Sequence, residues 1–391
     1  MSENIVIIGA NEFQLPLVLR AKQMGLTTHV FAWREGAVAA EAADRFYPIS
    51  IVETEEILKE CRRISPKAVA TIGSDLAAIT VNKLANALGL PSNPPVTAHI
   101  ATNKYAMRGA LLKAGVPTPA FVSLAAGEDT SAVRRMRLPV IVKPTDRSDS
   151  RGITKLESLD GLDAAIALAA GQSFEKRAIV EEFAAGHEYS CECVSQYGVH
   201  HMLALTKKFT TGAPHYIETG HIQPAGLSED ERERVRSAVF AALDALQVTT
   251  GASHTEFKLL PDTGEVFIIE VGARMGGDCI GSDLVRISTG HDFLKLTLQA
   301  ALGEPIDLSV PADFVPRTAA IRFIFNRADL ARLNAIKADS EAASHIVRVS
   351  DIAMGEDDMI TDSGSRFGFY ILSCGDERSA RELAGLNEDI E

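Results

Sequence analysis

The sequence predicts a multidomain protein that begins with a parallel α/β sheet and continues in α+β units. Its 391 residues are enough for two or three domains with ordinary cores. Short β-branched runs alternate with helical patterns up to a Pro-rich stretch at Leu90–His99, and such alternation is typical of a parallel sheet. Hydrophobic residues make up 46% and charged residues 23% of the chain, which indicates a globular protein and argues against disordered or fibrous classes.

The first unit is predicted to alternate strands and helices. We expect strands at Asn4–Gly9, Thr28–Trp33 and Lys67–Gly73, and helices near Gln14–Met24, Thr54–Arg63 and Asp75–Leu88. The prolines of Leu90–His99 end this pattern, so the first domain is predicted to cover residues 1–97.

The rest of the chain is predicted to be α+β. After a helix and a loop at Pro117–Pro119, Leu138–Phe183 has the pattern strand, Gly/Ser loop, strand, helix, strand. A strand-rich region with one helix follows to about Leu302, and then two strands and a closing helix at Glu377–Leu386. We therefore expect a second domain at 98–305, with a lid at about 120–185 and a metal-binding and catalytic part at about 186–305, and a C-terminal α+β domain at 306–391.

Composition excludes several classes of partner. The net charge is −13 and no basic stripe is visible, so a nucleic-acid partner has no electrostatic support. The five cysteines are predicted to be buried and structural, since only Cys191 and Cys193 lie close together and two thiols do not make a metal site. The start of the chain lacks the features of a signal peptide, and no uncharged apolar stretch reaches the roughly 18–20 residues needed to span a bilayer. We therefore expect a cytoplasmic protein without a membrane partner.

A dinucleotide site at the first strand–helix turn is poorly supported. Gly9 is the only glycine of the segment GANEFQ, whereas the dinucleotide fingerprint requires three. A plain turn that borders a substrate pocket is the better interpretation.

The strongest chemical pattern is the segment His254–Asp278. Two predicted strands carry one carboxylate each, Glu256 and Glu270, and a turn with Pro and Gly joins them. Such a hairpin places two hard oxygen ligands side by side, which suits Mg²⁺ bound next to a polyphosphate. Arg274 follows before a Gly-rich turn, where its guanidinium could hold a phosphoryl or acyl-phosphate oxygen. The alternative for either carboxylate alone is a solvated acid on a surface hairpin.

A second candidate site lies at Val142–Gly152. Lys143 ends an apolar strand, where an unpaired ammonium would be costly to bury. The loop after it offers amides and hydroxyls for phosphate oxygens, with Ser150, Arg151 and Gly152 at its end. The Walker pattern is absent. The alternative is a flexible surface loop with a lysine that reaches solvent.

A third candidate is the segment Ile179–Glu188, a strand that ends in acids and is followed by a glycine and another acid. It could form an interdomain hinge that binds adenine through backbone groups and a ribose through a carboxylate. Singly, each glutamate equally fits an exposed surface position. The candidate nucleotide-binding residues here are Glu181, Glu182, Phe183, Ala184 and Glu188.

The polar, Gly-rich segment Lys207–Gly226 is predicted to be a functional loop because it is long and lacks periodicity. Its candidates are Lys207, His215, Glu218 and His221, although each histidine equally fits a structural hydrogen bond.

Together these segments resemble the ATP-grasp superfamily. The resemblance rests on the order of four motifs: NK at Asn103 and Lys104, VKP around Lys143, VEEFxxGxE ending at Glu188, and HTE…IIE…R…GG. HTEFKL followed by IIEVGAR, together with the C-terminal GSRFGFYILSCGDERSARELA, is similar to the L-amino-acid ligase (dipeptide synthetase) group. The resemblance covers nearly the whole chain and implies an ATP-grasp fold with an N-terminal Rossmann-like preATP-grasp domain.

The resemblance also implies roles for the candidate residues. Lys104 and Lys143 would contact the ATP phosphates, Glu181 and the backbone of Ala184 the adenine, and Glu188 the ribose. Glu256 and Glu270 would bind Mg²⁺, with Mn²⁺ as an alternative, and Arg274 would stabilise an acyl phosphate. Many members have asparagine where this chain has Gly272, which favours the amino-acid ligase branch and leaves a second Mg²⁺ in doubt.

The implied activity is that of an ATP-dependent carboxylate–amine ligase. It would form an amide or peptide bond through an acyl phosphate and release ADP and phosphate, with an amino acid as one substrate. Arg274, Lys143 and His221 are the candidate catalytic residues. The alternatives are an ATP-grasp ligase of another class (purine-biosynthetic, carbamoyl-phosphate or biotin-carboxylase-like) or a nucleotide-binding regulator without catalysis. The expected partners are a small carboxylate and a small amine, and a homodimer is left open.

Overall fold

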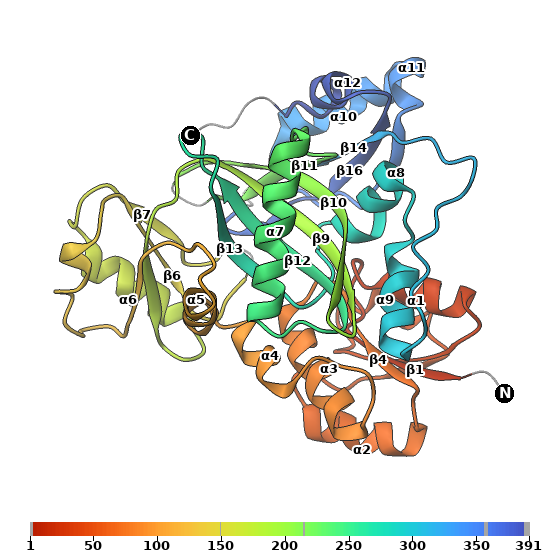
Figure 1. The fold of residues 1–391 in the computed structure, drawn as a ribbon. Coiled ribbons are helices and arrows are strands. Elements are labelled where there is room, and N and C mark those ends of the chain that lie inside the picture. The colour runs from red at the N-terminus through yellow and green to blue at the C-terminus, as the bar shows by residue number, and fades with distance from the viewer. Residues whose placement is uncertain (1–2, 149, 214–215, 356–358, 387–391) are drawn as a thin grey trace.

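The computed structural model describes residues 3–148, 150–213, 216–355 and 359–386. Its strands form three sheets, one parallel and two antiparallel, and helices cover their faces (Figure 1). In Figure 1 the N-terminal sheet lies at the bottom, the small second sheet projects to the left, and the large sheet fills the centre and runs up to the C-terminal helices. The predicted combination of α/β and α+β units is confirmed.

The N-terminal sheet is parallel with the strand order β3-β2-β1-β4. Its strands are β1 (Asn4–Ile8), β2 (Thr27–Phe31), β3 (Arg45–Tyr47) and β4 (Ala68–Ala70), and its helices are α1 (Leu15–Gln23), α2 (Thr54–Ile64) and α3 (Asp75–Leu88). The six predicted elements are confirmed. The strand β3 was not predicted, because three residues are too few to show a period.

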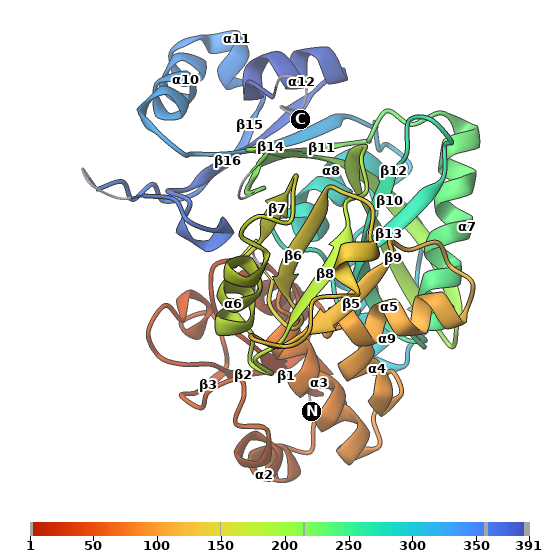
Figure 2. The ribbon, with the colours of Figure 1, turned by 90° about the vertical axis from the view of Figure 1, so that its left-hand side faces the viewer.

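The second sheet is antiparallel with the order β5-β8-β6-β7, and α6 packs on it (Figures 1 and 2). Its elements are β5 (Phe121–Leu124), β6 (Val140–Pro144), β7 (Thr154–Leu156), α6 (Leu162–Gln172) and β8 (Ala178–Glu182). The last four follow the predicted order of strand, strand, helix and strand, whereas β5 was not predicted. Two helices precede this unit, α4 (Pro95–Ile100) and α5 (Lys104–Lys113). The side chain of Asn103 caps α5 by accepting a hydrogen bond from the amide of Ala106, which places Lys104 at the first turn.

The large sheet is antiparallel with the order β13-β12-β9-β10-β11-β14-β16-β15. Its first five strands are β9 (His187–Gln196), β10 (Val199–Thr210), β11 (Glu218–Gln223), β12 (Gly251–Leu259) and β13 (Val266–Gly272). The last three are β14 (Thr318–Phe323), β15 (Ile346–Val349) and β16 (Phe369–Cys374). The sheet is therefore continuous across residue 305, where we predicted a boundary.

The helices of this part are more numerous than predicted. They are α7 (Glu229–Ala245), α8 (Val285–Thr289), α9 (Phe293–Leu302), α10 (Arg327–Ala338), α11 (Ser340–Ala343) and α12 (Glu377–Ala384), with a π-helical turn at Ile280–Leu284. The expectation of one helix up to Leu302 is thus wrong. The reason is burial: α9 lies between the N-terminal sheet and the large sheet, so most of its side chains are apolar and it lacks a clear polar face. The two C-terminal strands and the closing helix are confirmed.

One hydrophobic core ties the N-terminal sheet to the large sheet. It includes Ile7 and Val30 from the first sheet, Val194 from β9, and Phe293 and Leu296 from α9, all buried. This packing holds the N-terminal domain against the strands that carry the candidate site. All five cysteines are free and buried, as predicted.

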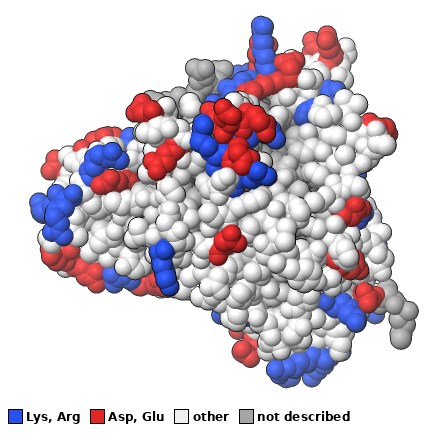
Figure 3. Space-filling model, viewed as in Figure 1, with Lys and Arg blue, Asp and Glu red and all other residues white. Residues whose placement is uncertain are grey.

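The surface agrees with the charge pattern of the sequence. On the face shown in Figure 3, positive and negative side chains are interspersed, with no continuous basic stripe. Within the described ranges, no helix combines the length and the apolar character needed to cross a membrane.

Candidate active site

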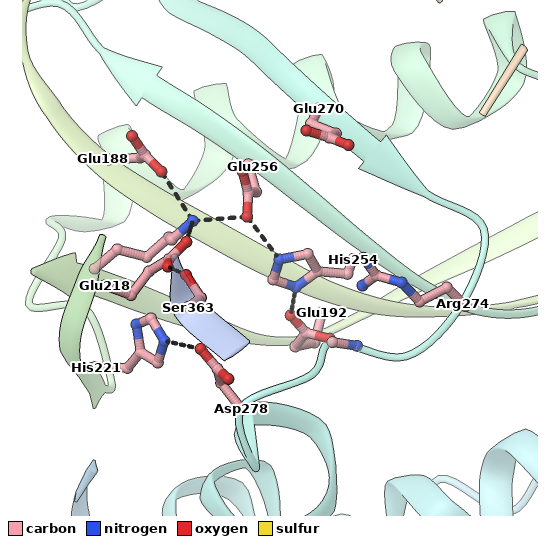
Figure 4. A network of polar contacts seen from close by, with 12 residues as sticks. Glu188, Glu192, Glu218, His221, His254, Glu256, Glu270, Arg274, Asp278 and Ser363 are labelled. Carbon is pink, nitrogen blue, oxygen red and sulfur yellow. Dashed lines mark hydrogen bonds and ion pairs between the residues drawn. The ribbon is translucent and has the colours of Figure 1, made fainter. Parts of the chain in front are cut away.

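The carboxylates Glu256 and Glu270 lie directly opposite each other on β12 and β13 (Figure 4). Opposite residues of an antiparallel pair project from the same face, about 5 Å apart at their Cβ atoms. The predicted hairpin with two neighbouring acids is therefore confirmed. Both side chains are about one quarter exposed, so they reach the surface of the site while their strands are packed.

His254 joins Glu256 to a buried acid that the sequence did not single out. Its Nε2 lies 3.3 Å from Oε1 of Glu256, and its Nδ1 contacts Oε1 of Glu192, which is fully buried (Figure 4). Burial works to lower the pKa of His254, but the Glu192 carboxylate, and after it Glu256, raise it to about 9. The imidazole is thus a cation at neutral pH, held between two carboxylates.

Gly276 is required by this arrangement. Its amide donates to Oε2 of Glu192 at 3.1 Å. A Cβ at this position would lie 2.8 Å from Nδ1 of His254 and 2.9 Å from Oε2 of Glu192. The Gly-rich turn after β13 can therefore approach the ion pair only because it lacks a side chain here.

Lys208 on β10 was missed at the sequence level and is a central cation of the site. Its Nζ lies 2.6 Å from Glu256, 2.8 Å from Glu188 and 3.6 Å from Glu218, and the side chain is buried. Burial opposes its charge, but these three carboxylates raise the pKa of Lys208 well above its usual value. The signal available in the sequence was the pair KK on a strand, since one of two successive residues must face the site.

Lys104 reaches the other carboxylate of the hairpin. Its Nζ lies 3.0 Å from Oε1 of Glu270 and donates to the carbonyl of Arg147 at 2.7 Å. Burial acts to lower the pKa of Lys104, yet the Glu270 carboxylate raises it above its ordinary value. The structure thus brings the first turn of α5 to the end of β13.

Lys143 is buried with Glu181 and Arg108, and Arg108 was not predicted. Nζ of Lys143 lies 2.6 Å from Oε2 of Glu181, and Nε of Arg108 lies 2.5 Å from Oε1. Burial resists ionisation of Glu181, but the two cations lower its pKa to about 2. Burial lowers the pKa of Lys143, and Arg108 and Lys104 add to this effect. One carboxylate shared between two buried cations leaves an excess of positive charge, which an anion would relieve.

Arg274 is held by the N-terminal domain. Its Nε and Nη2 lie 2.8 and 3.2 Å from the two oxygens of Asp75, the first residue of α3. Burial works against the charge, but Asp75 raises the pKa of Arg274 above its ordinary value. A Cβ at Gly272 would lie 3.0 Å from Cζ of Arg274, so the small residue noted in the sequence makes room for the guanidinium.

His221 lies on β11 next to a second ion pair. Its Nε2 is 3.3 Å from Oδ2 of Asp278 (Figure 4). Arg366 holds Asp278 with contacts of 2.6 and 3.0 Å. Oγ of Ser363 donates to Glu218. The C-terminal region therefore contributes to the site, which the sequence did not predict.

The remaining candidates line the second sheet and its loop. Ser150 donates to the carbonyl of Tyr216 at 3.2 Å, and Arg151 lies 3.8 Å from Asp362. Gly152 has a positive φ of 64°. Glu182 accepts a hydrogen bond from the amide of Arg137. The ring centre of Phe183 lies 4.3 Å from Nζ of Lys155 and 4.6 Å from Nζ of Lys258. Ala184 is buried.

Lys207 is also buried, with its Nζ 5.4 Å from the ring centre of Phe209. Lys207 lies on β10, so it is not in a loop. The prediction of a loop at Lys207–Gly226 is wrong over residues 207–210 and 218–223, which belong to β10 and β11. His215 lies outside the described residues.

The oxygen donors that this site offers to a metal ion are carboxylates. In the described part of the chain, no group of three or more His, Cys, Asp and Glu side chains is arranged to hold a metal. Mg²⁺ does not need one, because it commonly takes one or two carboxylates together with substrate phosphates and water. Glu256 is anionic, since Lys208 and His254 hold its pKa well below the usual range against the effect of burial. The paired carboxylates therefore fit Mg²⁺ or Mn²⁺ bound together with a polyphosphate.

Residues 136–283 match a family model described as an ATP-grasp domain. The chain contains an ATP-grasp domain. The matched range contains the nucleotide and metal candidates from Lys143 to Arg274. The crystal structure of an L-amino acid ligase from Bacillus licheniformis superposes on this chain with a TM-score of 0.81 and 26% identity, and the superposition covers 98% of each chain. The similarity of the ATP-grasp fold therefore extends over nearly the whole chain. A phosphoribosylglycinamide synthetase from Anaerococcus prevotii shares the fold, with a TM-score of 0.76 and 20% identity.

The chain is also similar to curated ligases. A D-alanine–D-alanine ligase of Polynucleobacter asymbioticus is 28% identical over 239 residues, which are 59% of this chain and 67% of that enzyme. An alanine–anticapsin ligase of Bacillus subtilis is 28% identical over 279 residues, which are 65% of this chain and 58% of that enzyme. The alignments thus leave about a third or more of these relatives unmatched.

Proposed function

We propose that the protein is an ATP-dependent ligase that joins a carboxylate to an amine through an acyl phosphate, with an amino acid as one substrate. The observation that carries this proposal is the placement of Glu256 opposite Glu270, between the cations Lys104 and Lys208 and close to Arg274. The D-alanine, anticapsin and L-amino acid ligases named above support the reaction class. The cytoplasmic location and the open question of a homodimer stay predictions of the sequence.

The buried cations suit the phosphates of ATP. Lys143 and Arg108 share a single carboxylate, and Lys104 lies near enough to lower the pKa of Lys143 further. A polyphosphate placed between Lys143 and Lys104 would remove this repulsion, so the site favours an anion. Glu256 and Glu270 would hold Mg²⁺, which neutralises charge on the transferred phosphoryl group when bound.

The nucleoside would lie beside the second sheet. Glu181 accepts one hydrogen bond at each oxygen from Arg108 and Lys143, and each oxygen has a further lone pair for an adenine amino group. Glu188 is held 2.8 Å from Lys208, which positions it for a ribose hydroxyl. Ala184 offers only its backbone, as expected for a contact with the adenine ring.

Arg274 is positioned to act on the acyl phosphate. A guanidinium fixed by Asp75 at two atoms can approach a planar oxyanion without losing further side-chain entropy. Stabilisation of developing charge by a fixed donor is commonly the largest contribution to such a reaction. Lys143, Lys104 and Arg274 would orient the phosphoryl group toward the substrate carboxylate, and a closed site would keep water from the acyl phosphate.

Hydroxylamine trapping tests this proposal. Purified protein is incubated with MgATP, hydroxylamine and single carboxylates from an amino-acid panel, and hydroxamate and ADP are measured. We expect hydroxamate to form with one or a few amino acids and to decrease when the second substrate is supplied. ADP and phosphate without hydroxamate for every carboxylate would contradict the proposal and favour an ATPase or a regulator. Hydroxamate that requires bicarbonate or biotin would indicate carboxylase-type chemistry.

A further inference from the structure

His221 faces the same side of the large sheet as the metal-binding carboxylates. On β11 it pairs directly with Lys208 of β10, and opposite residues in an antiparallel pair project from one face. Lys208 in turn contacts Glu256. The imidazole is 1% exposed, so it is buried in the wall of the site.

The two nitrogens of this imidazole have different surroundings. Nε2 faces the carboxylate of Asp278 at 3.3 Å, and since an ionised carboxylate only accepts hydrogen bonds, Nε2 carries a proton. Nδ1 is buried, and among the described residues no hydrogen-bond partner reaches it. In the neutral ring, Nδ1 therefore presents a lone pair that protein groups do not use. A buried acceptor without a partner is costly and indicates a ligand donor.

Asp278 is held in place from the C-terminal region. Nη2 and Nη1 of Arg366 lie 2.6 and 3.0 Å from its two oxygens, and Nε of Arg366 donates to the carbonyl of Ser363 at 2.6 Å. The guanidinium lies 3.5 Å from the ring centre of Phe323. Asp278 also has a positive φ of 52°, a conformation that its surroundings must impose. Arg366 and His221 keep the pKa of Asp278 well below its usual range, so the carboxylate stays charged next to the imidazole.

Asp278 lies on the same turn as Arg274. Asp278 follows Arg274 by four residues, with the glycines 276 and 277 between them (Figure 4). The charged groups that surround His221 are Asp278 from this turn, Arg366 from the C-terminal region and Lys208 from β10, and Phe323 of β14 contacts the ring edge-on. The imidazole is therefore oriented by residues from four different segments.

We propose that His221 is the base that deprotonates the amine substrate, and that Asp278 and Arg366 are the residues that position it. The proposal rests on the ligase function proposed above. The ligand of this subsite is a primary ammonium group, which is protonated at neutral pH and cannot attack until it loses a proton.

The step balances without any further reactant. Nδ1 of His221 takes one proton from the ammonium group, and the freed nitrogen lone pair forms the C–N bond at the acyl carbon. The bond between that carbon and the bridging phosphate oxygen breaks, and phosphate leaves with the electron pair of that bond. The second proton that the nitrogen must lose to become an amide goes to the departing phosphate. Asp278 stabilises the imidazolium ion that forms, and the ring then returns its proton to water.

A comparison of two nucleophiles tests the role of His221. Hydroxylamine is largely uncharged at neutral pH and needs no base, whereas an amino acid does. Rates of hydroxamate and of amide formation are measured for the wild type and for His221→Gln, Asp278→Asn and Arg366→Lys. We expect amide formation to fall on the order of 100-fold for His221→Gln and about 10-fold or more for the other two. Hydroxamate formation should stay within about 3-fold of the wild type, because acyl-phosphate formation does not use this base.

Asp329→Asn is the matched control. Asp329 is also a buried aspartate paired with an arginine, 2.6 Å from Nη2 of Arg322, but it lies on α10 away from the site. Its two rates should fall together if they fall at all. The hydroxamate rate also reports the folded fraction of each variant, so a folding defect cannot imitate the expected result.

The outcomes separate this proposal from the ligase function. Equal losses of hydroxamate and amide in the His221 and Asp278 variants, or no loss in either, would overturn the role of His221 while the ligase function stands. Absence of hydroxamate with the wild type for every carboxylate would overturn the ligase function itself, and this proposal with it.

Discussion

Replacing Glu181 by Gln should destabilise the protein in a pH-dependent way. The carboxylate lies between Arg108 and Lys143 at 2.5 and 2.6 Å, and all three side chains are buried. The amide of Gln keeps the shape but loses the charge, so both cations stay buried without a counterion. Breaking a buried pair in this way commonly costs about 3–5 kcal/mol.

The structure gives a similar magnitude. The pKa of Glu181 is about 2 in the folded protein against 4.5 for an unperturbed glutamate. This difference corresponds to about 3 kcal/mol at about 1.4 kcal/mol for each tenfold change in acidity. Because the folded pKa is the lower one, this stability is present above pH 4.5 and is lost as the pH falls toward 2. The difference between wild type and variant should therefore shrink from about 3 kcal/mol at pH 7 to about 1.5 kcal/mol near pH 3.

Urea unfolding followed by circular dichroism at several pH values between 7 and 3 measures this difference. Glu182→Gln is the control, because the neighbouring carboxylate is 22% exposed and meets Arg137 at 3.5 Å on the surface. It should change the free energy of unfolding by less than about 1 kcal/mol at any pH. A difference for Glu181→Gln that does not depend on pH, or one no larger than that of the control, would refute the reasoning.

Three further results are expected. Glu270→Gln should reduce ATP-dependent turnover by about 100-fold or more with the fold intact. The control Glu265→Gln, on the exposed turn of the same hairpin, should leave turnover unchanged. Near wild-type ADP release by Glu270→Gln at saturating Mg²⁺ would show that Glu270 is not a metal ligand. Gly276→Ala should lower both stability and activity, because its Cβ would lie within 3 Å of two side chains. The control Gly109→Ala has open space around it in α5 and should stabilise the protein by up to about 1 kcal/mol. MgATP should slow tryptic cleavage after Arg151, whose side chain is about one third exposed, relative to cleavage elsewhere in the chain. Equal rates of cleavage after Arg151 with and without MgATP would argue against a lid role for the loop that follows Lys143.

Local sequence patterns were enough to predict the hairpin that places Glu256 opposite Glu270. Glu256 and Glu270 belong to two strands joined by a short turn, so their register depends only on nearby residues. The same holds for Asn103, which caps α5 and so places Lys104, and for the strand that ends at Lys143. The elements of the N-terminal sheet were predicted for the same reason, since each has its own period and its own glycine or proline at the ends.

The partners of these residues could not be predicted, because they come from distant parts of the chain. Glu181 meets Arg108 across 73 residues, Arg274 meets Asp75 across 199 residues, and Arg366 meets Asp278 across 88 residues. Each side chain, taken alone, has the pattern of a surface charge. Lys208 meets the carboxylates because β9 lies between β10 and β12, an order of strands that no local pattern contains.

The sequence by itself therefore determined the class of protein, the order of the predicted strands and helices in its N-terminal region and in residues 138–183, and the candidate residues for phosphate and metal. Only the tertiary structure decided which cation neutralises which carboxylate, and that the C-terminal residue Arg366 belongs to the site. The physical reason is that hydrogen-bonded turns and hydrophobic periods are local properties of a chain. Buried ion pairs depend on where the sheets bring distant segments together, and their pKa values depend on the burial that results.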